Sequence, residues 1–147
     1  MLGAAGNLLL VAPIAVFVPT LVEAEGLGAG ALGAFAAAQA VGWVTGAVAA
    51  PLTSDKGRAN ARTAFVSIIV GAALLYPSAF VAANLHALCA VAFAASAALG
   101  VFEVQWESYL QQNVDIAAVG RACAIDAWAS SAGRTVGLTA AGGQPVR

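Results

Sequence analysis

Long runs without a charged side chain are the dominant pattern of the chain. Residues 1–22, 26–54 and 63–102 contain no Asp, Glu, Lys or Arg. A helix that crosses a bilayer needs about 20 mostly apolar residues to cover about 30 Å of hydrocarbon. The third run would be about 60 Å long as a single helix, so we expect it to fold back once. Tyr76, an interfacial aromatic, and Pro77, a helix stop, mark the expected break.

A further apolar stretch follows a polar connector towards the C-terminal end. Only Asp126 and Arg134 interrupt it after its first residue, Arg121. The pattern predicts an all-α membrane protein with about five transmembrane helices, in one transmembrane domain that covers residues 1–147. The expected spans are residues 2–22, 31–52, 63–78, 84–107 and 121–142, with loops at 53–62 and 108–120 on the same side of the membrane.

Composition supports lipid as the natural solvent of this chain. Hydrophobic residues make up 61% of the sequence and charged residues only 9%, whereas a soluble domain carries about 25% charged residues. The net charge of −1 argues against a nucleic-acid partner, which would require a clustered basic face. Cys89 and Cys123 have no metal-ligand spacing and resemble small buried hydrophobic residues. No nucleophile–base pair, phosphate-binding glycine loop or ligand cluster is present, so neither an enzyme, a cofactor nor a metal site is expected.

The basic residues predict the orientation. Three of the six Lys and Arg, namely Lys56, Arg58 and Arg62, lie between the second and third spans, whereas the preceding loop carries only Glu23 and Glu25. By the positive-inside rule, this places the N-terminus and the loop 53–62 in the cytoplasm. A second interpretation is that these cations only set the orientation and touch anionic lipid head groups.

Small and charged residues suggest how the helices pack. Gly42 and Gly46 form a G-x-x-x-G pair, which favours either close packing inside the bundle or self-association. Asp126 shares one face of the last span with several small residues, so this face should meet protein or water. Those residues are Ser130, Gly133, Gly137 and Ala141.

Four charged residues are candidates for a transport pathway or gate. Glu103 and Asp126 lie about one turn into the membrane, where pairing with Arg121 would offset the cost of burying charge. Arg134 lies about 20 Å beyond Arg121 along the last helix, past the middle of the membrane. An ionisable residue at that depth favours a water-filled pathway or an anionic partner, so Arg134 is the candidate for substrate contact.

Two stretches resemble the major facilitator superfamily of transporters. "PLTSDKGRANAR" resembles the cytoplasmic loop motif G-x-x-x-D-[RK]-x-G-R-[RK] of that family. Asp55, Lys56, Gly57 and Arg58 match in kind. One residue is missing after Lys56, and Pro51 stands in place of the leading glycine.

The second stretch, from Val104 to Gly142, resembles the tenth and eleventh helices of bacterial drug- and siderophore-exporter-like members. The family pattern has a W-x-x-x-L-Q segment, a connector and then R-V-x-S-x-D. Ala124 replaces the usual serine, and Arg134 stands where a small residue is usual. The matching residues are Trp106, Leu110, Gln111, Arg121, Asp126, Gly137 and Gly142.

The resemblance implies a truncated C-terminal half of a facilitator-type bundle, covering helices seven to eleven. It implies a proton-coupled exporter of small, often amphipathic molecules in the cytoplasmic membrane of a bacterium, with an N-terminal half as the missing partner. Apart from the resemblance, Arg134 would favour anionic substrates. Such exporters rock two halves about a central site. The alternative is a small integral membrane protein that self-associates as a scaffold or small multidrug pump.

Overall fold

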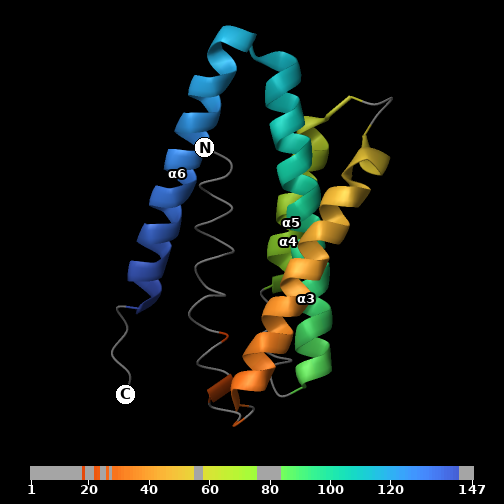
Figure 1. Cartoon of the computed structure of the whole chain (residues 1–147), viewed down its shortest axis with the longest axis vertical. Coiled ribbons are helices and arrows are strands. Elements are labelled where there is room, and N and C mark those ends of the chain that lie inside the picture. The colour runs from red at the N-terminus through yellow and green to blue at the C-terminus, as the bar shows by residue number, and fades with distance from the viewer. Residues whose placement is uncertain are drawn as a thin grey trace.

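The part of the chain that is described is helical. The computed structural model describes residues 18, 22–23, 26, 28–54, 58–75 and 84–142. The elements with defined bounds, shown in Figure 1, are α3 (Gly28–Ala49), the 3₁₀-helix η2 (Ala50–Thr53), α4 (Ala61–Leu75), α5 (Leu85–Asn113) and α6 (Ile116–Gly142). The predicted all-α class is therefore confirmed.

Two of these helices have the dimensions of a membrane span. By length and composition, α3 continued by η2 (Gly28–Thr53, 26 residues) and α5 (29 residues) are long and apolar enough to cross a bilayer. The third expected span corresponds to α4, a shorter apolar helix of 15 residues. The first expected span, 2–22, lies outside the described residues except for Val18 and Val22. The count of five spans stays a prediction.

The helix bounds differ most from the sequence-based expectation at the connector 108–120. Helix α5 continues to Asn113 and α6 begins at Ile116, so the connector is reduced to two residues. The N–H of Val114 donates to the carbonyl of Leu110 at 2.9 Å and closes α5. The Asp115 carboxylate accepts the N–H of Ala117 at 3.1 Å and caps α6. The polarity of this segment suggested a loop, but glutamine is a good helix former and its polar side chain fits a solvated turn.

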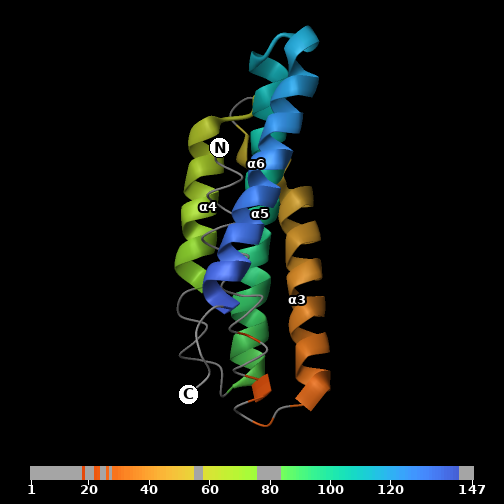
Figure 2. The same cartoon turned by 90° about the vertical axis from the view of Figure 1, so that its left-hand side faces the viewer.

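Helix α5 is the centre of the bundle. Figure 2 shows α5 between α4 and α3, and α5 packs extensively against both. Towards α4, a cluster of buried side chains forms from Ala64, Ile68, Ala95 and Phe102. A second cluster of buried side chains lies near the starts of α3 and α5 and consists of Val18, Val22, Ala31, Phe35, Leu88 and Ala92.

The α3–α5 interface depends on glycine. A Cβ atom on Gly46 would collide with the backbone carbonyl of Ala97, and one on Gly42 would lie 2.9 Å from the carbonyl carbon of Phe93. Gly100 of α5 reciprocates, since a Cβ there would lie 2.9 Å from the amide nitrogen of Ala47. The G-x-x-x-G pair therefore serves close packing within the chain, where small residues allow two backbones to approach.

Candidate functional site at the charged end of the bundle

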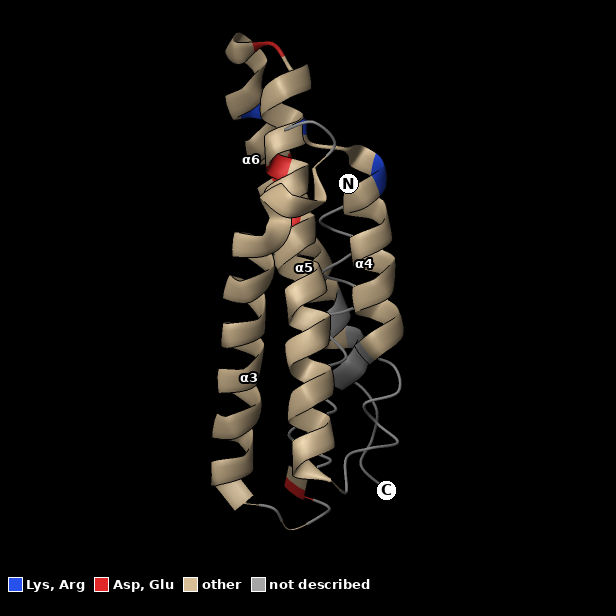
Figure 3. Ribbon diagram, turned by 90° about the vertical axis from the view of Figure 1, so that its right-hand side faces the viewer, with Lys and Arg blue, Asp and Glu red and all other residues tan. Residues whose placement is uncertain are grey.

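The described charged side chains lie near the ends of the bundle. Figure 3 shows most of them towards the end where α5 turns into α6 and α4 begins, with a long uncharged zone along α3, α4 and α5. Glu23 directly follows Val22, which packs with Ala31 and Leu88 near the starts of α3 and α5. The polar end is therefore the place where a functional site is to be sought.

Gln105 is the best-connected polar side chain of this end. It is only 2% exposed. Its amide nitrogen lies 2.8 Å from the carbonyl oxygen of Ala50, 2.9 Å from Oγ of Ser54 and 3.1 Å from Oγ1 of Thr53, and its two N–H hydrogens are shared among these three acceptors. Its amide oxygen accepts the backbone N–H of Asn60 at 3.2 Å.

These contacts involve backbone groups at helix ends, which need hydrogen-bond partners from outside their own helix. The last carbonyls and the first N–H groups of a helix have no partner within that helix. Gln105 binds the carbonyl of Ala50, where α3 passes into η2, and the N–H of Asn60 just before α4, so one buried side chain contacts both ends of the connector. It thereby fixes the connector between α3 and α4 against α5.

A second glutamine holds the same connector. Gln112 lies two turns beyond Gln105 on the same face of α5, and its amide oxygen accepts the backbone N–H of Ala59 at 3.2 Å. Asn60 completes the arrangement, because its side-chain oxygen accepts the N–H of Arg62 at 2.9 Å at the start of α4. Two glutamines of α5 thus bind consecutive N–H groups of the connector. We call Gln105 and Gln112 the glutamine clamp.

The two candidate acids each contact a tryptophan of a neighbouring helix. The indole N–H of Trp106 on α5 donates to the carboxylate of Asp126 on α6 at 3.3 Å. The side chain of Trp43 on α3 hydrogen-bonds to Glu103 on α5. Trp106 also stacks on Tyr109 with ring centroids 6.1 Å apart. The acids therefore link different helix pairs, α5–α6 for Asp126 and α3–α5 for Glu103.

The structure shows fewer contacts, or no side-chain position, for the remaining predicted site residues. Arg121, the partner expected for these acids, is exposed near the start of α6. Arg134 lies on α6, but its side chain is outside the described part of the chain, and so are Asp55, Lys56 and Gly57 of the loop motif.

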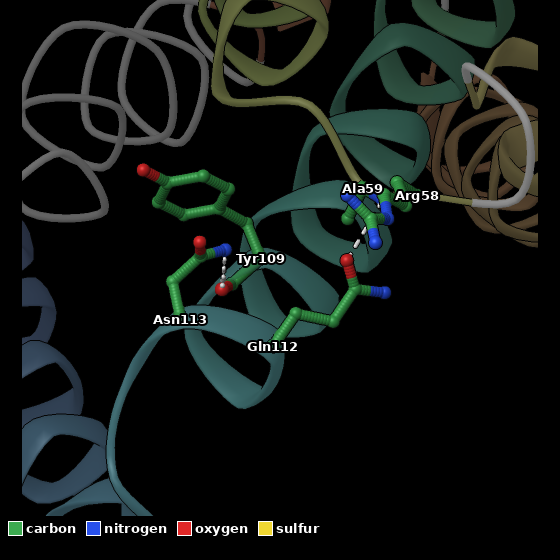
Figure 4. Close-up of a pocket in the computed structure, with 5 residues that line it drawn as sticks. All are labelled: Arg58, Ala59, Tyr109, Gln112 and Asn113. Carbon is green, nitrogen blue, oxygen red and sulfur yellow. Dashed lines mark hydrogen bonds between the residues drawn. The ribbon is translucent and has the colours of Figure 1, made fainter.

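Arg58 lines a hollow open to solvent, of about 410 Å³. The other lining residues are Ala59, Tyr109, Gln112 and Asn113. Figure 4 shows Arg58 and Ala59 next to Gln112 on one side, with Tyr109 and Asn113 on the other. The Asn113 amide donates to the carbonyl of Tyr109 at 2.8 Å, and the Gln112 oxygen is occupied by Ala59. The guanidinium of Arg58 thus supplies hydrogen-bond donors at its rim.

The comparisons with known proteins add no relative. No protein-family model, curated protein or solved structure matches the chain. Function must therefore be argued from the residues themselves.

The chemistry available at this end is recognition and positioning. The described residues contain no group of three or more His, Cys, Asp or Glu that could hold a metal ion. Cys89 is half-buried as a free thiol. Cys123 was expected to be buried, but it is exposed, because it lies on a face of α6 that the described helices leave uncovered.

Sequence reasoning missed Gln105, although a signal was present. The buried positions of α5 include Leu88, Ala92, Ala95 and Phe102, which recur at three- and four-residue steps or their sums. The next step from Phe102 is Gln105. A glutamine on the core face of an otherwise apolar helix must find partners, because burying an unpaired amide is costly.

Proposed function

We propose that the chain is part of the helical bundle of a membrane transporter of the major facilitator type, which exports small molecules with proton coupling. The observation that carries this proposal is the charge-free length of α3. Helix α3 has 22 residues and no charged side chain, and it measures about 33 Å, close to the thickness of the hydrocarbon layer.

The outer faces of the helices support a bilayer environment. Leu52 is 87% exposed and Trp128 is 75% exposed. A monomeric soluble protein rarely leaves large contiguous apolar surface in water, whereas lipid would cover such faces at no cost. Exposed large hydrophobic side chains include Val41, Val44 and Val48 of α3, Phe65, Val66, Ile69 and Val70 of α4, and Ile116, Ile125 and Val136 of α6.

The polar end supports transport more than a purely structural role. Asp126 contacts α5 through a tryptophan, and Arg134 follows eight residues later on the same helix, about 12 Å along its axis. Ionisable residues in such a segment mark substrate or proton pathways. A pathway of the facilitator type forms between two bundles that rock against each other. We therefore propose that this chain works with a second bundle and that Asp126, Arg134, Glu103 and Arg121 line or gate the pathway.

Dye efflux from bacterial cells tests the proposal. Cells that express the chain joined to the N-terminal half of a facilitator-type exporter should accumulate less of an amphipathic fluorescent dye than cells that express that half alone, and a protonophore should abolish the difference. Alkaline carbonate extraction of the membranes provides the control for insertion. If the chain resists extraction but leaves dye accumulation unchanged, the transport function is refuted; if carbonate releases it, the bilayer location is refuted as well.

A further inference from the structure

We propose that the hollow beside Arg58 binds a phosphate group, either the phosphodiester of an anionic lipid or free inorganic phosphate. Its walls combine a cation, amide groups and an aromatic ring, and it opens to solvent. The inference rests on the bilayer location in the proposed function for the lipid source only, and it requires no transport activity.

The charge of Arg58 is available to a ligand. Among the residues that the structure describes, no carboxylate pairs with its guanidinium, and its side chain is exposed. A guanidinium offers five N–H donors in a planar fork that matches two phosphate oxygens. An exposed arginine at the edge of a hollow, with no carboxylate partner among the described residues, is thus suited to bind a phosphate rather than a single neutral acceptor.

The neighbouring amide fixes the backbone beside Arg58. The oxygen of Gln112 accepts the N–H of Ala59, which fixes the orientation of the amide. In Figure 4 its nitrogen lies on the side away from Tyr109 and Asn113, so Arg58 is the residue that supplies donors to the hollow. The glutamine clamp thereby holds Arg58 in place, because Arg58 directly precedes the residue that the clamp binds.

The size and the position of the hollow fit a lipid head group. A volume of about 410 Å³ would accommodate roughly a dozen water molecules of ~30 Å³ each, which is ample for a phosphodiester. The hollow lies where the uncharged zone of the helices ends, and Tyr109 on its wall is a residue type enriched at the membrane interface. The phosphates of anionic lipids lie at this level and attract basic residues.

Native mass spectrometry of the full chain in a neutral detergent tests lipid binding. We expect phosphatidylglycerol to bind more tightly than phosphatidylcholine, and Arg58→Gln to weaken phosphatidylglycerol binding by about tenfold, as expected for the loss of a charge-assisted hydrogen bond. Arg58→Lys should fall between the two, since it keeps the charge and loses the fork. Arg62→Gln is the matched control, because Arg62 is an exposed cation four residues away that does not line the hollow.

A second measurement separates the two sources of phosphate. The thermal midpoint of the protein in phosphatidylcholine nanodiscs is compared with and without inorganic phosphate, and with phosphatidylglycerol in place of part of the phosphatidylcholine. An Arg58-dependent rise with the lipid, the ion or both supports the site and identifies its source. If neither raises the midpoint, or if Arg62→Gln weakens binding as much as Arg58→Gln does, the site is refuted.

The variants must also be shown to fold. Arg58→Gln should keep the helical circular dichroism and the thermal midpoint of the parent in detergent without added phosphate, because its side chain is exposed. Failure of the chain to enter nanodiscs would contradict the bilayer location. Phosphate binding in detergent would still decide whether the hollow is a phosphate site.

Discussion

Replacing Gln105 tests most directly whether the glutamine clamp stabilises the bundle. Gln105→Met keeps the length and approximate volume of the side chain but removes its hydrogen bonds. If Gln105 only filled space in an apolar helix, methionine would be neutral or stabilising. If the clamp holds the connector, the variant must lose free energy of unfolding.

The contacts of Gln105 allow an estimate of that loss. A hydrogen bond contributes about 0.5–1.5 kcal/mol net, and the two N–H hydrogens and the accepting oxygen of Gln105 make at most three full bonds, so the upper limit is about 4.5 kcal/mol. The carbonyl of Ala50 keeps a second donor, the hydroxyl of Thr53 at 2.7 Å, so it is not left unpaired. Ser54 is only partly buried and Asn60 is exposed, so water can replace their lost partner. We therefore expect a loss of about 2–4 kcal/mol.

The assay is equilibrium unfolding in mixed micelles, with the denaturing detergent titrated and helicity followed by circular dichroism. Gln111→Met is the matched control, since Gln111 is an exposed glutamine of the same helix. Gln105→Glu should be more destabilising than Gln105→Met, because a carboxylate would face three acceptor oxygens in a buried site. If Gln105→Met and Gln111→Met change the free energy of unfolding equally, the reasoning about the clamp is refuted.

Three further predictions concern packing, the acid–tryptophan contact and topology. Gly46→Ala should destabilise the bundle by about 1–3 kcal/mol, because the added methyl group would overpack against α5. Gly33→Ala is the control, since Gly33 has open space around it and the substitution should not destabilise the bundle. Equal free energies of unfolding for the two variants would contradict this prediction. Trp106→Phe and Asp126→Ala should show a coupling free energy of about 1 kcal/mol in a double-mutant cycle, and strict additivity would mean that their hydrogen bond contributes nothing. A cysteine at position 57 of a cysteine-free variant should react with an impermeant reagent only after the cells are permeabilised, and labelling of intact cells would reverse the predicted orientation.

The helical architecture was the part of the structure most accessible from sequence. Charge-free runs of bilayer length predicted α3 and α5, because in such runs the only stable way to satisfy the backbone is a helix. The fold-back within 63–102 was also predicted, since one helix of that length would exceed any bilayer. The bounds agree within a few residues at the start of α5, where Asn84 caps the helix by accepting the N–H groups of His86 and Ala87.

The turn between α5 and α6 was predicted less well for a physical reason. Between residues 108 and 120, the sequence changes from apolar to polar, and polarity was interpreted as irregular structure. A helix that leaves the apolar layer can continue into water, provided that its residues favour helix formation. Its end is decided locally by capping, here by the single residue Asp115, rather than by mean hydropathy.

The site was harder to predict than the fold because charge is a poor guide to buried polar contacts in this chain. Attention to charged residues identified Glu103, Asp126 and Arg121, and the pairing of the acids with the arginine stays a prediction. Both acids also contact tryptophan, an uncharged donor that the sequence analysis did not consider. The most connected side chain, Gln105, is uncharged, so only its position on the buried face of α5 could have identified it.

The contacts of the polar end divide the bundle into parts that are held differently. Gln105 and Gln112 fix the α3–α4 connector to α5, and the glycine seam fixes α3 to the same helix. Helix α6 packs against α5 much less than α3 and α4 do, and Trp106 gives it a hydrogen bond through Asp126. Among the described residues, α3, α4 and α5 are therefore held together by more contacts than those that hold α6. Under the proposed transport function, we expect the helix that carries Arg121, Asp126 and Arg134 to move relative to the other three.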